Sequence, residues 1–274
     1  MKIQKIGFIG GGNMARSLIG GLIADGHAPD TIWVSDTSQD QLNRLKQMLK
    51  VNITTDNNEL VSATDIIVMA VKPQVMKTVA EEISDSVQRQ QPLVISIAAG
   101  IQEKSLNHWL GENTAIVRTM PNTPALVQTG ATALYANARV SDEQRNAAET
   151  IMRAVGLALW LNDEGQMDAV TALSGSGPAY FFLFMEAMEE AAIKLGLPDK
   201  TARLLTLQTA FGAAKMALES PENCATLRQR VTSPGGTTEQ AINTFEKGQL
   251  RKRVDDALQA AASRSAELAK QLGE

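Results

Sequence analysis

A glycine-rich string near the amino terminus is well suited to binding a ligand. Residues 10–15 read Gly-Gly-Gly-Asn-Met-Ala, which fits the G-x-G-x-x-G/A pattern of dinucleotide-binding turns. In that pattern Gly10 permits the tight turn, Gly12 lets the backbone approach a pyrophosphate, and Ala15 allows a helix to pack closely on a strand. The string opens a helical pattern. A pyrophosphate is therefore expected at the helix N-terminus, where free N–H groups and the helix dipole favour an anion.

Asp36 ends the next predicted strand, where dinucleotide-binding folds carry an acidic residue. A carboxylate there accepts hydrogen bonds from the adenosine ribose hydroxyls and repels a 2′-phosphate, which favours NAD(H). The hydroxyls of Ser35, Thr37 and Ser38 could instead bind a phosphate. Asp36 could also simply cap the following helix. The preference between NADH and NADPH stays open.

Small, polar or rigid residues follow three other predicted strands. They read Ala-Val-Lys-Pro at 70–73, Ala-Ala-Gly at 98–100 and Met-Pro-Asn-Thr-Pro at 120–124. Ligands of doubly wound sheets lie along the carboxyl ends of the strands, so we expect these segments to line a cofactor cleft. Lys72 is either a catalytic lysine or, as we favour, a solvated or phosphate-facing one, because lysine is rarely buried.

A second glycine-rich turn, Ser-Pro-Gly-Gly-Thr-Thr at 233–238, precedes a helical pattern in the second half. Its glycines expose backbone N–H groups and its threonines add hydroxyls, so it could grip a substrate carboxylate. Alternatively, Thr237 or Thr238 merely caps the helix, and the spacing does not decide between the two. The string at 173–178, Leu-Ser-Gly-Ser-Gly-Pro, permits close approach of helices and cofactor or forms a linker turn.

The elements that must position these turns alternate in the first half. Short apolar runs predict strands at residues 5–9, 31–35, 51–54, 65–71, 93–97, 115–118, 131–135 and 158–161. Apolar spacings of three and four predict helices at residues 13–25, 39–49, 74–85 and 142–154. Such alternation indicates a parallel sheet covered by helices on both faces.

After about residue 163 the pattern is entirely helical. It predicts long helices at 178–195, 200–219 and 250–272 and shorter ones at 225–231 and 238–247. We therefore predict an α/β fold, with a doubly wound Rossmann-type domain over residues 1–163 and an all-helical domain over 164–274. The helical half has more apolar residues than a small bundle needs, which suggests contacts between subunits. A compact monomeric core is the alternative.

Composition narrows the function further. The 274 residues carry 26 Lys and Arg against 30 Asp and Glu without a visible basic cluster, which argues against a nucleic-acid partner. One cysteine, Cys224, allows no intrachain disulfide and no metal-ligand cluster, as is typical of a reducing cytoplasmic compartment. The run Gly-Gly-Gly-Asn at 10–13 and then Arg16 interrupt the amino-terminal apolar stretch, unlike a secretory signal. Charged side chains within 179–195 exclude a membrane span there.

The strings together resemble the pyrroline-5-carboxylate reductase family over nearly the whole chain. The resemblance rests on IGFIGGGNMA at 6–15, AVKPQ at 70–74, SIAAG at 96–100, RTMPNTPALV at 118–127, LSGSGPAY at 173–180 and VTSPGGTTEQAI at 231–242. It implies NAD(P)H-dependent reduction of 1-pyrroline-5-carboxylate to L-proline, the last step of proline biosynthesis. It also implies a cofactor-binding amino-terminal domain and a helical domain that binds substrate and forms an intertwined homodimer, in many members within a ring of dimers.

The resemblance also assigns roles to residues of this chain. The pyrophosphate is expected against Gly10, Gly12, Asn13 and Met14, and the adenosine ribose near Asn57. The cleft toward the nicotinamide is expected to be lined by Ala70, Lys72, Pro73 and Asn122. The substrate is expected against Ser233, Gly235, Gly236, Thr237 and Thr238, with Thr238 nearest the ring nitrogen. Two residues depart from the family pattern. Asp36 stands where members that accept a 2′-phosphate tend to have a neutral residue, and Arg230 stands where many members have a small amide.

Hydride transfer to an imine explains why no histidine, cysteine or paired-carboxylate constellation accompanies the first turn. A protonated cyclic imine already has an electrophilic carbon, so the protein must mainly position the reactants. A β-hydroxyacid dehydrogenase would need a general base, commonly a lysine on the first long helix of the second domain, and no lysine appears there before Lys194. A protein of another functional class is the second alternative: a cofactor sensor or scaffold that binds the nucleotide without catalysing a reaction.

Overall fold

The computed structural model describes residues 4–273. Within them, eight strands form one sheet in the order β3-β2-β1-β4-β5-β6-β7-β8. The strands are β1 (Ile6–Ile9), β2 (Ile32–Ser35), β3 (Asn52–Thr54), β4 (Ile66–Met69), β5 (Leu93–Ser96), β6 (Ala115–Met120), β7 (Gly130–Ala136) and β8 (Gly156–Trp160). Each predicted strand is confirmed, with shifts of two residues or fewer at its ends.

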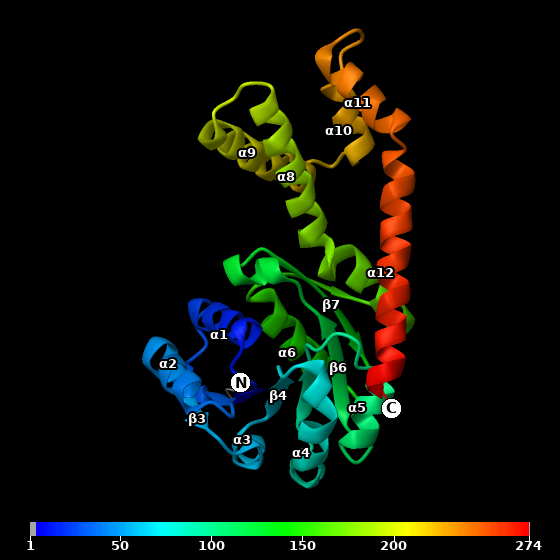
Figure 1. Cartoon of the computed structure of the whole chain (residues 1–274). Helices are drawn as coiled ribbons and strands as arrows, with labels where there is room; N and C mark the ends of the chain where they lie inside the picture. The colour runs from blue at the N-terminus through cyan, green and yellow to red at the C-terminus, as the bar shows by residue number, and fades with distance from the viewer. Residues whose placement is uncertain (1–3, 274) are drawn as a thin grey trace. The chain divides into compact units, whose positions relative to one another are not determined.

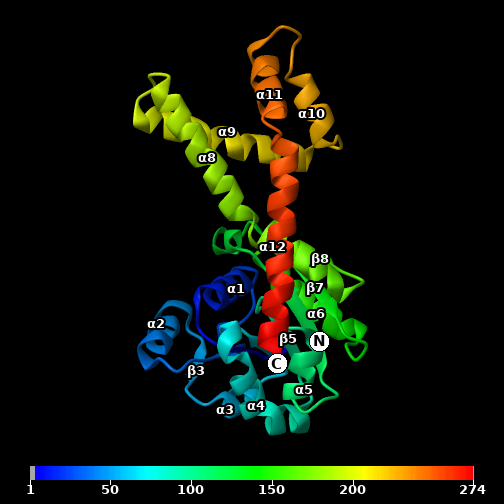
Figure 2. The same ribbon diagram turned by 45° about the vertical axis from the view of Figure 1, so that its right-hand side comes forward.

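Helices cover both faces of this sheet (Figures 1 and 2). One face packs against α1 (Asn13–Ala24), α2 (Gln39–Leu49) and α6 (Asp142–Arg153). The other packs against α3 (Asn57–Ala63), α4 (Met76–Gln90) and α5 (Glu103–Trp109). Successive strand side chains alternate between the two cores: Phe8 is buried in the first and Ile9 in the second.

The first six strands have the order 3-2-1-4-5-6 of a doubly wound Rossmann sheet, which confirms the predicted fold class. The prediction of parallel pairing is wrong at one place, because β7 runs antiparallel to β6. Residues 121–129 connect these strands through only the short 3-10 helix η3 (Thr123–Val127). A parallel connection needs a dozen or more residues. The longer connection through α6 returns β8 parallel to β7.

Two short helices, α3 and α5, lie where the apolar pattern predicts none. Asp56 caps α3, with Oδ1 accepting hydrogen bonds from the N–H groups of Asn58 (2.8 Å) and Glu59 (3.3 Å). The first N–H of α5, on Glu103, donates to a carboxylate oxygen of Glu164 at 2.7 Å. Each of these helices begins at a polar contact and buries only two apolar side chains, Leu60 and Val61 on α3 and Leu106 and Trp109 on α5.

The rest of the chain is helical. After the 3-10 helix η4 (Glu164–Gln166) come α7 (Met167–Val170), a π-helical turn (η5, Thr171–Gly175), α8 (Gly177–Lys194), α9 (Asp199–Glu219), α10 (Cys224–Arg230), α11 (Thr237–Lys247) and α12 (Leu250–Gly273). The five helices predicted for this half are confirmed. None of the described helices is long and apolar enough to cross a membrane.

The described chain divides into two compact units, one made of residues 4–176 with 261–273 and the other of residues 177–260. This differs from the predicted boundary at 163/164. The segment after 163 packs on the first unit, where Asn122 Nδ2 donates to the carbonyl of Ser174 at 3.0 Å. The end of α12 also belongs to that unit and lies beside α5 in both views (Figures 1 and 2), where Gly273 accepts a hydrogen bond from Ser105 Oγ at 3.3 Å.

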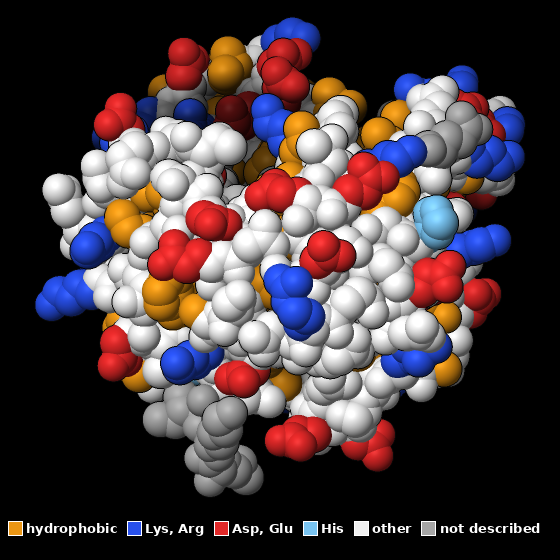
Figure 3. Space-filling model, turned by 90° about the horizontal axis from the view of Figure 1, so that it is seen from below, with side chains coloured by type: hydrophobic (Ala, Val, Ile, Leu, Met, Phe, Trp, Pro, Cys, Tyr) orange, Lys and Arg blue, Asp and Glu red, His pale blue; other side chains and the backbone are white. Residues whose placement is uncertain are grey.

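Large apolar side chains stay exposed on α8 and α9 in the second unit. Phe181 and Leu183 are 68% and 67% exposed, and Phe211 on α9 is 62% exposed. Soluble monomers rarely expose so many large apolar groups close together. On the face shown in Figure 3, by contrast, Lys and Arg alternate with Asp and Glu and form no single basic patch.

Candidate functional site

The first glycine turn has a backbone that only glycine accommodates easily. Gly10 has a φ of +99°, and its N–H donates to the carbonyl of Ser35 at 2.8 Å. A Cβ at Gly10 would lie 2.7 Å from the carbonyl oxygen of Ala70. The positive φ confirms the tight turn predicted at Gly10, and the close approach to the end of β4 is a further reason for glycine there.

The next glycines lead into an open helix N-terminus. Gly12 is the N-cap of α1 and provides no side chain to cap it. A Cβ at Gly12 would meet nothing within 4 Å. Ala15, by contrast, is completely buried on the face of α1 that packs against the sheet. The first N–H groups of a helix have no partner within it. Exposed Gly12 and Asn13 therefore form a cradle of N–H donors that suits a pyrophosphate.

Strand register brings the other predicted cofactor residues to the same edge. Ile9 at the end of β1 pairs with Ser35 of β2 and with Met69 of β4. Asp36 and Ala70, which directly follow those strands, therefore flank the turn. The strand order reverses between β1 and β4, and this is where doubly wound sheets bind their ligands.

Asp36 holds the glycine turn. Its Oδ2 accepts hydrogen bonds from the N–H of Gly11 (2.8 Å) and from Nε2 of Gln41 (3.2 Å), and its Oδ1 accepts one from the N–H of Ser38 (2.9 Å). The alternative that Asp36 caps α2 is wrong, because Ser38 is the N-cap and its Oγ accepts from the N–H of Gln41. The sequence did not predict the contact with Gly11, which joins residues 25 apart.

Asn57, the first residue of α3, is fixed at both ends of its amide. Its Oδ1 accepts a hydrogen bond from Oγ of the buried Ser35 at 2.7 Å. Its Nδ2 lies 3.2 Å from both carboxylate oxygens of Glu82. The structure thus places Asn57 beside the end of β2, next to Asp36. Neither Ser35 nor Glu82 was predicted to orient it.

Lys72, Pro73 and Asn122 are the other residues expected near the nicotinamide. Lys72 is exposed, as the favoured interpretation predicts, and Pro73 begins the 3-10 helix η2 (Pro73–Val75). The amide of Asn122 is occupied by backbone groups: Oδ1 accepts from the N–H of Ala131 at 2.8 Å, while Nδ2 donates to Ser174. Asn122 therefore ties three segments together. Its place beside a nicotinamide stays a prediction.

The second glycine turn precedes α11. Gly235 has a φ of +73°, and the N–H of Gly236 donates to the carbonyl of Ser233 at 3.0 Å. Gly236 is the N-cap, so the alternative that Thr237 or Thr238 caps the helix is wrong. Thr237 is instead the first helical residue. The N–H groups of Thr237 and Thr238 have no capping side chain and are open to an anion.

Glu239 is a member of this turn that the sequence interpretation missed. Its Oε2 accepts a hydrogen bond from the N–H of Gly235 at 2.8 Å. A glutamate three residues after an N-cap is a known signal for a carboxylate that reaches back to the turn. That signal is present in the sequence between Gly236 and Glu239.

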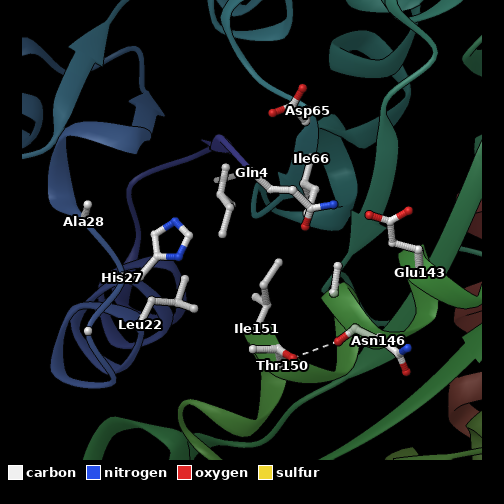
Figure 4. Close-up of a pocket in the computed structure, with 13 residues that line it drawn as sticks. Gln4, Leu22, His27, Ala28, Asp65, Ile66, Glu143, Asn146, Thr150 and Ile151 are labelled. Carbon is white, nitrogen blue, oxygen red and sulfur yellow. Dashed lines mark hydrogen bonds between the residues drawn. The ribbon is translucent and has the colours of Figure 1, made fainter. Parts of the chain in front are cut away.

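A pronounced hollow on the described residues lies elsewhere. It has a volume of ≈ 810 Å³ and is lined by residues at the amino-terminal ends of the strands, including Ile6 and Ile66 (Figure 4). His27 lines it, and burial lowers the pKa of this imidazole. This is the opposite edge of the sheet from the glycine turn. Among residues 4–273, no group of three or more His, Cys, Asp or Glu could hold a metal ion.

The sheet order and the first glycine turn define a Rossmann-type domain, and the comparisons with known proteins place the chain among the NAD(P)-dependent oxidoreductases. Two family models match the chain: "NADP oxidoreductase coenzyme F420-dependent" over residues 5–100 and "Pyrroline-5-carboxylate reductase dimerisation" over residues 164–268. The pyrroline-5-carboxylate reductase of Pseudomonas aeruginosa is 52% identical over 274 residues, covering 100% of both chains. The chain belongs to the pyrroline-5-carboxylate reductase family.

Solved structures agree with this assignment. The pyrroline-5-carboxylate reductase of Coxiella burnetii is 51% identical and superposes with a TM-score of 0.94, covering 97% of this chain and 99% of that one. The Plasmodium falciparum enzyme, solved with NADP bound, is 31% identical with a TM-score of 0.86, covering 98% and 99%. The family resemblance of the sequence strings is thereby confirmed.

Proposed function

We propose that this chain reduces 1-pyrroline-5-carboxylate to L-proline with NAD(P)H, the last step of proline biosynthesis. The observation that carries the proposal is the turn at 233–238, where the uncapped N-terminus of α11 has Thr238 as its second residue. A small ring acid with a carboxylate and an adjacent nitrogen matches that N-terminus and the Thr238 hydroxyl. The reaction adds a hydride to the C=N carbon and leaves a proton on the ring nitrogen.

The first unit binds the cofactor in this proposal. Its pyrophosphate rests on Gly10, Gly12, Asn13 and Met14, because the open N-terminus of α1 attracts an anion. The adenosine ribose lies by Asp36 and Asn57. The nicotinamide lies toward Ala70, Lys72, Pro73 and Asn122. When bound, the reduced nicotinamide supplies the hydride.

The second turn holds the substrate. Ser233, Gly235, Gly236, Thr237 and Thr238 form this site. The N–H donors at the start of α11 receive the substrate carboxylate, because a helix N-terminus favours a negative charge. Thr238 accepts or donates a hydrogen bond at the ring nitrogen and so turns the C=N carbon toward the hydride donor. Holding reactants in such a geometry supplies several kcal/mol of barrier lowering.

The assembly that we propose is a homodimer, with a ring of dimers as its larger form. Exposed Phe181, Leu183 and Phe211 on α8 and α9 support it, since a second subunit would cover them. A single cysteine, Cys224, fits a cytoplasmic location.

Absorbance of the reduced nicotinamide tests the activity. We expect it to decay when the protein is mixed with pyrroline-5-carboxylate and either NADH or NADPH, with formation of L-proline. A cofactor sensor would bind both nucleotides and cause no decay with either. Folded protein that behaves in this second way would overturn the proposed reaction.

A further inference from the structure

The turn before α11 has its own arrangement of hydrogen bonds. Pro234 and Gly235 occupy its two central positions, and the positive φ of Gly235 (+73°) is the value that type II turns require at the third residue. The N–H of Gly236 closes the turn onto Ser233 at 3.0 Å. This bond leaves the N–H of the exposed Gly235 outside the turn and available to another acceptor.

Glu239 provides that acceptor. In a capping box, the third helical residue accepts the N–H of the N-cap itself. Here the N-cap N–H, on Gly236, is already used, and the carboxylate reaches one residue further back to Gly235 at 2.8 Å. A hydrogen bond to a charged group is about twice as strong as a neutral one. The contact therefore holds the peptide of Gly235 in one orientation.

This arrangement divides the donors of the turn into two groups. The N–H groups of Gly235 and Gly236 are used within the protein, by Glu239 and Ser233. Those of Thr237 and the following residue begin the helix without a cap. A substrate carboxylate that bound Gly235 would have to displace Glu239 and lie against a like charge.

We propose that Glu239 is a positioning residue for the substrate turn. Its carboxylate holds Gly235, so that the turn presents the N–H groups of Thr237 and Thr238 to the substrate carboxylate. Glu239 itself does not touch the substrate. The inference rests on the proposed function, because it assigns the substrate to this turn.

Two substitutions separate the reach of the Glu239 side chain from its charge. Glu239→Asp keeps the charge but shortens the side chain by one methylene, so that it no longer reaches Gly235. Glu239→Gln keeps an acceptor oxygen at the same distance and removes the charge. Glu246→Asp, at the far end of the same helix where Glu246 pairs with Arg251, is the matched control.

We expect Glu239→Asp to raise the KM for pyrroline-5-carboxylate about tenfold, the loss of one hydrogen bond to a charged group, with the KM for NAD(P)H unchanged. Glu239→Gln should stay within about threefold of the parent, as should Glu246→Asp. A raised KM in Glu239→Gln but not in Glu239→Asp would show that the charge of Glu239 matters and not its reach to Gly235, and would overturn the proposal. Equal behaviour of the two Glu239 variants, whether impaired or intact, would overturn it as well.

Hydrogen exchange of the peptide that spans residues 233–239 measures the contact between Gly235 and Glu239 independently of enzyme activity. The Gly235 amide should exchange slowly in the parent chain and in Glu239→Gln, and faster in Glu239→Asp. If the parent chain reduces no pyrroline-5-carboxylate, the proposed function fails. Exchange then still decides whether Glu239 holds the turn, and unchanged exchange in Glu239→Asp would overturn that role.

Discussion

The two glycine turns, before α1 and before α11, share a local construction. Each has one glycine at positive φ and a glycine N-cap that leaves the helix without a capping side chain. Each also donates one loop N–H to a carboxylate at 2.8 Å, from Gly11 to Asp36 and from Gly235 to Glu239. Both are built to offer helix N–H groups to an anion.

They differ in where their support comes from. Asp36 reaches the first turn from the end of another strand, and Gly10 is packed against the backbone of Ala70. Glu239 belongs to the helix that it serves, and Gly235 is exposed. The first turn is thus completed by the tertiary packing of one unit. The second is a local motif, and the proposed enzyme needs further surfaces to enclose a substrate there.

Gly10→Ala should have the largest effect. A Cβ would lie 2.7 Å from the carbonyl of Ala70 at a φ of +99°, so the turn must shift and the pyrophosphate cradle is lost. We expect NAD(P)H affinity to fall by about a hundredfold or more, measured by nucleotide fluorescence titration, as for the loss of several hydrogen bonds. Gly20→Ala, in α1 with nothing within 4 Å, is the control and should bind normally.

Thr238→Ala tests the second turn in the same way. Loss of the hydroxyl should lower kcat/KM for pyrroline-5-carboxylate by about tenfold to a hundredfold, because a substrate hydrogen bond is removed. The Kd of NAD(P)H should not change. The control is Thr244→Ala on the outer part of α11, where the hydroxyl bonds to the carbonyl of Gln240. An unchanged steady-state profile for Thr238→Ala would exclude the assigned role.

Asp36→Asn sharpens the comparison of the two carboxylates. If Asp36 faces the adenosine ribose, removal of its charge should raise the NADPH-to-NADH ratio of kcat/KM by about tenfold, through lost repulsion of the 2′-phosphate. Initial rates with each nucleotide at equal concentration measure it. Asp40→Asn on α2 is the matched control. A ratio that does not move would limit Asp36 to holding Gly11.

Asn122→Ala should affect stability more than cofactor selectivity. It removes two partly buried hydrogen bonds, to Ala131 and to Ser174. The free energy of unfolding should fall by about 1–3 kcal/mol, measured by urea denaturation. Thr123→Ala, at an exposed neighbour, is the control. A stable Asn122→Ala variant with impaired nicotinamide binding would instead support the role that the family resemblance implies.

The smallest effect is expected at His27, far from both turns. Burial lowers its pKa in the folded chain below the ordinary value of 6.5. The unfolded chain therefore binds a proton on His27 more readily than the folded chain does. The neutral, partly buried His27 is tolerated above about pH 6.5, and the free energy of unfolding falls as the pH drops from there through the folded pKa. His27→Gln should flatten the pH dependence of unfolding in that range. If His27→Gln leaves the slope of unfolding free energy against pH unchanged, the lowered pKa of His27 is contradicted.

Local patterns predicted most of the secondary structure and both glycine turns. Apolar runs marked every strand, since the strands of a sheet covered on both faces are mostly apolar. Gly10 and Gly235 marked the turns because both have a positive φ, which disfavours a side chain. Glu239 could also have been found, because it acts within one helical turn of Gly236.

Tertiary structure decided what depends on distant partners. The polar contact at the start of α5 and the roles of Asp36 and Asn122 follow from contacts between segments far apart in sequence. Glu164 meets Glu103 across 61 residues, and Asn122 meets Ser174 across 52. A polar side chain has several possible partners of equal chemistry along the chain. Only packing brings one of them within hydrogen-bonding distance.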